Sequence, residues 1–241
     1  MRVSVFPTCL VDQCWPSAGV GTVRLLRRLG VEVGFDPQAT CCGQPAWNSG
    51  HRGPARLQAQ QWIEAFERGR AEHAVIPSGS CAAMVKHFPH LFEAGDPWHA
   101  RAEEMATHTH ELCAFVVREL GIDDVGASFR GRIGWHDACH GLRELGLHDE
   151  PRALLRRVRG AEYVELPEAD SCCGFGGTFA VKYPEISTAI ADRKLEAIAA
   201  ADIDVVVAGD ASCLMHIEGR LSRVGSKVRS MHIAELLGGS S

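Results

Sequence analysis

The amino-acid sequence predicts an α/β protein of two similar halves, each built on a parallel sheet, that are related by internal duplication. Short apolar runs alternate with longer segments that carry apolar residues at helical spacing. In addition, the motif Cys41-Cys42-Gly43 returns 131 residues later as Cys172-Cys173-Gly174. The repeat predicts one cysteine-rich half over residues 1–125 and a second over residues 126–241.

The first half shows the alternation clearly. Strands are predicted at 3–6, 31–35 and 73–77. Helices are predicted at 17–29 and 54–68. Gly30 is a stop signal for the first helix, and Gly43 and Pro45 mark a loop after the second strand. Apolar residues at helical spacing over 105–120 predict one more helix, in which Cys113 is a buried residue.

The second half repeats this plan. Strands are predicted at 132–135, 162–166 and 204–208, and the last of these is strongly β-branched. Helices are predicted at 151–158 and 186–200. The glycine-rich segment 172–177 is a predicted loop, and 227–232 with a short terminal helix closes the chain. Both halves are therefore expected to be Rossmann-like or flavodoxin-like.

Composition narrows the class of protein. The net charge is -5 and the basic residues do not cluster, which argues against nucleic acid as a partner. No apolar run approaches the roughly 18 residues of a membrane span. The first residues resemble a strand and not a secretory signal, so we expect a cytoplasmic protein. Ten cysteines are many for such a protein, and cytosolic thiols stay reduced, which favours metal or redox chemistry over disulfides.

Eight of the cysteines recur in the same order and at nearly the same spacing. They are Cys9, Cys41, Cys42 and Cys81 in the first half, and Cys139, Cys172, Cys173 and Cys213 in the second. Each follows a predicted strand or lies in the loop before the next helix. Because open α/β sheets bind ligands at the carboxyl ends of their strands, each quartet is expected to converge at one end of its sheet. Simple core packing is disfavoured, because adjacent residues of an extended chain face opposite sides. Cys14 does not recur.

Four converging thiolates suit either tetrahedral zinc or an iron–sulfur cluster. Structural zinc sites usually use cysteine pairs separated by about two residues, whereas here the gaps are long and the close pairs are directly adjacent. A cluster offers several ligand positions over a wider span. The neighbouring glycines allow backbone N–H groups to approach its sulfides. The pattern favours a cluster, with zinc as the alternative.

The cysteine pattern resembles the duplicated cysteine-rich CCG domain found in the catalytic subunit of heterodisulfide reductase and in the glycolate oxidase iron–sulfur subunit. It is more similar still to the lactate utilization protein A family. That likeness is carried by CCGQPA at 41–46, SGSC at 78–81, DSCCGFGGTF at 170–179 and SMHIAE at 230–235. The resemblance implies one or two [4Fe–4S] clusters per chain, held by the eight repeated cysteines. It also implies electron transfer in a complex that oxidises L-lactate to pyruvate, with partner proteins that include a ferredoxin-like iron–sulfur protein.

One departure from heterodisulfide reductase concerns the fifth cysteine of each site. That motif ends in Cys-x-x-Cys, but here the earlier position is Ser78 in the first half and Asp210 in the second. The departure argues against that enzyme's non-cubane cluster, while four cysteines suffice for an ordinary [4Fe–4S] cluster. Asp210 is expected to form a turn or cap a helix.

The sequence alone is compatible with three functions. The first is an electron-transfer subunit of a lactate-oxidising complex, and the second is a catalytic subunit that acts directly on a disulfide or a 2-hydroxy acid. The third is a non-catalytic module that holds structural zinc. His136 and His140 flank Cys139 and are expected to be loop residues that form hydrogen bonds, and His232 is expected to be structural.

Overall fold

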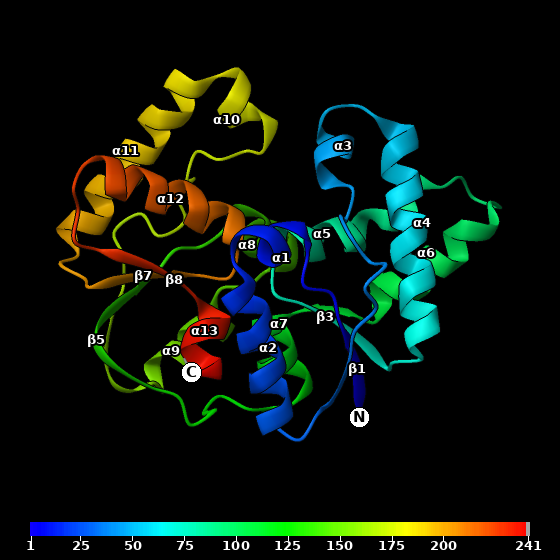
Figure 1. The fold of residues 1–241 in the computed structure, drawn as a ribbon, viewed down its shortest axis with the longest axis horizontal. Coiled ribbons are helices and arrows are strands. Elements are labelled where there is room, and N and C mark those ends of the chain that lie inside the picture. The colour runs from blue at the N-terminus through cyan, green and yellow to red at the C-terminus, as the bar shows by residue number, and fades with distance from the viewer. Residues whose placement is uncertain (240–241) are drawn as a thin grey trace.

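The computed structural model describes residues 1–239 and contains two four-stranded, all-parallel sheets (Figure 1). The first sheet has the order β2-β1-β3-β4, and the second has the order β6-β5-β7-β8. Their strands are β1 (Arg2–Val5), β2 (Glu32–Gly34), β3 (His73–Ile76), β4 (Thr109–Glu111), β5 (Ser128–Trp135), β6 (Arg159–Val164), β7 (Val205–Ala208) and β8 (Arg229–His232). Equivalent strands hold equivalent places in both sheets, so the predicted α/β class with two similar parallel-sheet halves is confirmed.

Helices connect the strands and cover the sheets (Figure 1). In the first half they are α1 (Cys9–Cys14), α2 (Pro16–Arg28), α3 (Gln44–Asn48), α4 (Arg52–Gly69), α5 (Gly79–His87), η1 (Phe88–Leu91), α6 (Pro97–Thr107), α7 (Leu112–Ala114) and η2 (Phe115–Glu119). In the second half they are α8 (Cys139–Leu145), α9 (Asp149–Arg156), α10 (Thr178–Lys182), α11 (Pro184–Ala200), α12 (Ala211–Arg223) and α13 (Ile233–Gly238). Within residues 1–239, none of the helices combines the length and apolar character that a bilayer crossing requires.

The prediction of a single helix over 105–120 is wrong. Strand β4 interrupts it and pairs with β3, with Ala74 opposite Thr109. Thr109 is β-branched and fully buried, which suits a strand, and its hydroxyl donates to the carbonyl of Met105 where α6 ends. The Glu111 side chain then accepts from the backbone N–H groups of Cys113 and Ala114 and begins a new helical segment. Cys113 is a buried helix residue, as predicted.

The two halves share one apolar core. Its largest cluster includes Val3 and Leu25 from the first half together with Ile133, Val205 and Leu237 from the second. The C-terminal helix α13 contributes to this cluster and lies along α2 (Figure 1). Separating the halves would therefore expose apolar surface on both. The proposed boundary at residue 125 remains a prediction.

Close contact between α2 and α13 depends on glycine. A Cβ atom added to Gly21 would collide with the backbone carbonyl of Ala234. We expect Gly21→Ala to lower the free energy of unfolding by about 1–3 kcal/mol, because the two backbones would have to move apart. In the matched control Gly219→Ala, on α12, an added Cβ has no atom within 4 Å. That variant should gain up to about 1 kcal/mol. Urea denaturation measures both, and equal effects would contradict the close-contact explanation.

Candidate metal centre

All eight repeated cysteines line one cleft of about 410 Å³. Cys9 and Cys139 begin α1 and α8, directly after the central strands β1 and β5. Cys81 and Cys213 lie in the first turns of α5 and α12, after β3 and β7. The adjacent pairs lie in the loops that follow β2 and β6. The structure thus brings each predicted quartet to the carboxyl ends of its strands. It also adds what the sequence did not predict, namely that both quartets face the same space.

The first quartet is a continuous chain of neighbouring thiols. The thiol of Cys41 interacts with those of Cys9 and Cys42. Cys42 Sγ in turn lies 3.2 Å from Cys81 Sγ. The backbone N–H of Gly43 donates to Cys41 Sγ over 3.5 Å. Gly43 has a φ of 85°, a conformation that glycine adopts at least cost.

The second quartet has the same loop geometry. Cys173 Sγ lies 3.1 Å from Cys213 Sγ, and the N–H of Gly174 donates to Cys172 Sγ over 3.3 Å. Gly174 has a φ of 91°, and an added Cβ would collide with the carbonyl of Ser187. In both halves the residue after the cysteine pair therefore has to be glycine. Burial raises the pKa of Cys139, and the neighbouring Cys172 raises it further.

The thiols of Cys9, Cys41 and Cys42 compete with one another for ionisation. Hydrogen bonds from Cys42 and Cys9 lower the pKa of Cys41 to about 3. The same contacts with Cys41 raise the pKa values of Cys42 and Cys9, and burial raises them further. One thiolate is stabilised at the expense of its neighbours. A metal ion or cluster removes this conflict, because its positive charge keeps coordinating thiols deprotonated. The donor set therefore fits a metal group better than four free thiols.

Asp210 caps two helices at once. Its Oδ1 accepts from the N–H of Ser212 at the start of α12, over 3.1 Å. Its Oδ2 accepts from the N–H of Ser80 in α5 of the other half, over 2.8 Å. The hydroxyl of Ser78 also donates to Oδ2, over 3.3 Å. The predicted capping role of Asp210 is confirmed, and its partner from the other half was not foreseen. The two positions that depart from the five-cysteine motif thus hydrogen-bond to each other.

Replacing Asp210 tests this double cap. We expect Asp210→Ala to destabilise the metal-free protein by about 1–3 kcal/mol, because two backbone N–H groups lose a buried acceptor. Asp210→Asn keeps one carbonyl oxygen and should fall between the wild type and the alanine variant. Urea denaturation followed by circular dichroism measures the series. Wild-type stability of the alanine variant would show that the cap contributes nothing.

A buried ionic network holds the segment between β5 and α8. The carboxylate of Asp137 lies 2.7 Å from the guanidinium of Arg152, and their side chains are 1% and 5% exposed. The indole of Trp135 also donates to Asp137, over 2.7 Å. Arg152 extends the network to Glu165 over 2.6 Å. This network fixes the chain on both sides of His136, immediately before Cys139.

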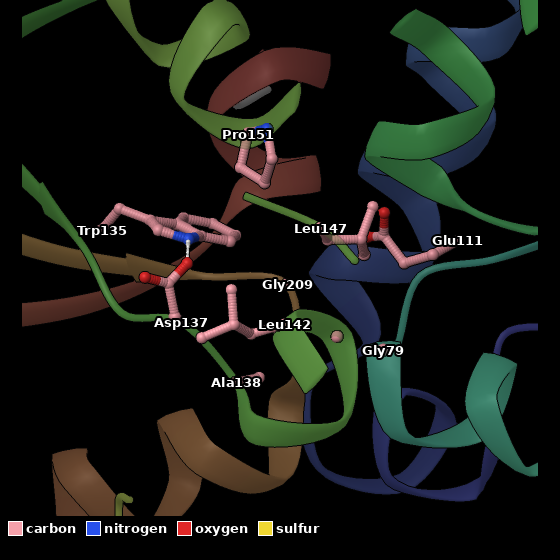
Figure 2. Close-up of a pocket in the computed structure, with 10 residues that line it drawn as sticks. Gly79, Glu111, Trp135, Asp137, Ala138, Leu142, Leu147, Pro151 and Gly209 are labelled. Carbon is pink, nitrogen blue, oxygen red and sulfur yellow. Dashed lines mark hydrogen bonds between the residues drawn. The ribbon is translucent and has the colours of Figure 1, made fainter. Parts of the chain in front are cut away.

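A small cavity of about 20 Å³ lies behind the helix N-termini, between the halves. Figure 2 shows the Trp135–Asp137 hydrogen bond on one side of it and Glu111 on the other. The volume is enough for about one water molecule. Burial raises the pKa of Glu111 to about 7. The hydrogen bonds that its carboxylate accepts from backbone N–H groups limit this rise.

The other candidate residues divide into three groups. His140 lines the cleft and hydrogen-bonds Glu144, and His232 accepts from Ala234 N–H as the cap of α13, so both predictions are confirmed. Cys14 is exposed at the end of α1 and does not line the cleft. His136 lies in a loop, as predicted, and its backbone N–H donates to the carbonyl of Val207, whereas its ring nitrogens have no hydrogen-bond partner among residues 1–239. Burial lowers its pKa to about 3, which leaves the ring neutral.

The fold and the site define a protein with two copies of the cysteine-rich domain named CCG, whose family matches residues 3–86 and 133–218. Curated relatives cover the whole chain. Lactate utilization protein A of Geobacillus kaustophilus (strain HTA426) is 47% identical over 237 residues, which are 98% of each chain. That of Macrococcus caseolyticus (strain JCSC5402) is 48% identical over 98% of this chain and 96% of its own. The chain belongs to the lactate utilization protein A family, as its motifs indicated.

Solved structures add little to this assignment. A glutamate racemase from Bacillus anthracis covers 99% of this chain and 78% of its own, at 12% identity and a TM-score of 0.38. A putative aspartate/glutamate racemase from Yersinia pestis has a TM-score of 0.35 at 12% identity, over 98% of this chain and 95% of its own. These values are too low to carry conclusions about this protein.

Proposed function

We propose that this chain is the iron–sulfur electron-transfer component of a system that oxidises L-lactate to pyruvate. The lactate role rests on the name shared by its relatives. The iron–sulfur role rests on one observation, the gathering of two cysteine quartets in a single cleft. Each quartet would hold one [4Fe–4S] cluster. The eight proposed ligands are Cys9, Cys41, Cys42, Cys81, Cys139, Cys172, Cys173 and Cys213.

Three features support clusters over zinc. The cleft has about 410 Å³, far more than a single tetrahedral ion occupies. Each quartet contains two adjacent cysteines, which suit the spread ligand positions of a cluster. The N–H groups of Gly43 and Gly174 already point at thiol sulfurs, and such hydrogen bonds set the potential of iron–sulfur centres.

The chain itself would hold the redox centres, bury their inner sides and leave one edge at the surface. An iron–sulfur cluster supplies one-electron chemistry when bound. Cys42 and Cys81 are buried on one side, as are Cys173 and Cys213 on the other, so the protein would shield the inner ligands of both clusters. Cys172 is exposed, which gives the second site an edge at the surface. A partner protein that carries a ferredoxin-like cluster is proposed to dock near this edge, in the cytoplasm.

Metal analysis of anaerobically purified protein tests the proposal. Iron and acid-labile sulfide should be present in nearly equal amounts, and the reduced protein should give an EPR signal. Zinc bound in stoichiometric amount without sulfide would support the structural-zinc alternative and defeat the proposal.

The shared cleft also supports a second candidate function. A space bordered by both quartets can admit a small substrate, so the chain could act directly on a disulfide or a 2-hydroxy acid. Assays of the isolated protein with L-lactate and an artificial electron acceptor separate the two functions. Electron transfer as a subunit predicts no turnover until the partner proteins are added, whereas sustained turnover by the isolated chain would favour the catalytic function.

A further inference from the structure

His136 is a buried side chain with no protein partner. It follows β5 directly, and its backbone N–H donates to the carbonyl of Val207 over 2.9 Å, which fixes its position. The residue is 1% exposed, and both ring nitrogens lack a hydrogen-bond partner in the part of the chain that the structure describes. An unsatisfied buried polar group costs about 1–3 kcal/mol. A group kept at such a cost points to a partner that is bound and not part of the protein.

The ring lies against the second cysteine quartet. One of its nitrogens and the Sγ atoms of Cys173 and Cys213 lie within 4.8 Å of one another. The carbonyl of Ala169 also lies near the ring, but it accepts from the N–H of Asp137 and from Lys194. The two thiols, and whatever they bind, are also within reach of the ring.

The first half has no such group. The equivalent position, 130 residues earlier, is Phe6, which is 1% exposed and packs against Trp62 with 4.7 Å between ring centroids. Phe6 belongs to the apolar cluster that also contains Cys42 and Cys81, and its phenyl ring has no polar atom that needs a partner. The duplicated halves thus differ at this point, with an apolar ring beside the first quartet and an imidazole beside the second. The second site therefore has a nitrogen donor beside its two buried thiols that the first site lacks.

We infer that His136 is a metal ligand of the second site, acting through a ring nitrogen alongside Cys173 and Cys213. This inference rests on the proposed iron–sulfur function. Imidazole is an accepted ligand of iron in such centres, where it replaces thiolate and raises the potential. A [4Fe–4S] cluster offers four terminal ligand positions, so His136 would take one of them in place of a cysteine of the second quartet. The two sites of one chain would then be chemically distinct, the first held by cysteine alone and the second by cysteine and histidine.

Pulsed EPR on anaerobic protein labelled with ¹⁵N-histidine tests the ligand directly. The Cys41→Ser variant lacks the first site, so the EPR signal of this variant comes from the second site. The second-site cluster should show the strong nitrogen coupling of a directly bound imidazole. The Cys172→Ser variant, which keeps the first site, should show none. In the Cys41→Ser background, His136→Phe reproduces the first-half residue and should abolish the coupling, whereas the control His140→Phe should retain it.

The outcomes separate this inference from the proposed function. A second-site cluster in the Cys41→Ser protein without strong histidine coupling would overturn the ligand assignment and leave the iron–sulfur function intact. A weak coupling would indicate a hydrogen bond to sulfur and would equally contradict ligation. Anaerobic protein without iron would overturn the proposed function, and this inference with it. The measurement on Cys41→Ser protein does not depend on the folding of the His136 variant.

Discussion

Cys41→Ser is expected to remove one iron–sulfur site and leave the other, so that iron and sulfide fall by roughly half. Cys41 is the central thiol of its quartet, in contact with both Cys9 and Cys42. A serine hydroxyl is a hard ligand that ionises far less readily than a thiol, and it replaces thiolate poorly at iron–sulfur centres. Cys172→Ser should cause the reciprocal loss. Iron and sulfide analysis with EPR spin counting measures both.

The control for these variants is Cys14→Ser. Cys14 is exposed and lies outside the cleft, so iron content should not change. The double variant Cys41→Ser/Cys172→Ser should lose nearly all iron. If both single variants keep the full iron content, the ligand assignment is wrong.

Asp137→Ala is expected to lower the free energy of unfolding by about 3–5 kcal/mol. The substitution leaves the guanidinium of Arg152 buried beside an empty position, and the indole N–H of Trp135 loses its acceptor. Arg152 keeps Glu165, which places the loss toward the lower end of that range. Urea denaturation of the metal-free protein measures the effect.

The control breaks an exposed ion pair of similar geometry. Glu67 and Arg101 lie 2.6 Å apart with side chains that are 45% and 35% exposed. Glu67→Ala should change stability by less than about 1 kcal/mol, because water solvates both charges. Equal losses in the two variants would show that burial of the Asp137–Arg152 pair does not matter.

The convergence of the cysteines could be predicted because it depends on local pattern and on one general property of parallel sheets. Each repeated cysteine follows a strand, and the carboxyl ends of parallel strands meet at one edge. The glycine that follows each cysteine pair could also be recognised in the sequence. In the structure both residues, Gly43 and Gly174, adopt positive φ angles. These features follow from residues close together in the sequence.

The shared cleft could not be predicted, because it depends on how the halves pack. That packing uses contacts between distant segments, such as Gly21 with Ala234 and Ser80 with Asp210. Strand β4 was hidden for a related reason. Its three residues lie inside a longer stretch of helical periodicity, and only pairing with β3 reveals them. In such cases tertiary contacts override local preference.

His136 shows a different limit of sequence reasoning. A histidine next to a cysteine in a loop is usually hydrogen-bonded, and nothing in the sequence marks this one as buried. Its special position becomes visible only when burial, the absence of a partner within residues 1–239 and the nearby thiols of Cys173 and Cys213 are seen together. The comparison with Phe6 also requires that the two halves be aligned with each other through the repeat.

Iron K-edge X-ray absorption on anaerobically purified protein tests the central claim most directly, since it reports the atoms around the metal. Two clusters held by the quartets predict iron surrounded mainly by sulfur, with a second iron at the short distance found only within clusters. Iron surrounded by oxygen and nitrogen, or sulfur ligation without any neighbouring iron, would contradict the assignment of both sites.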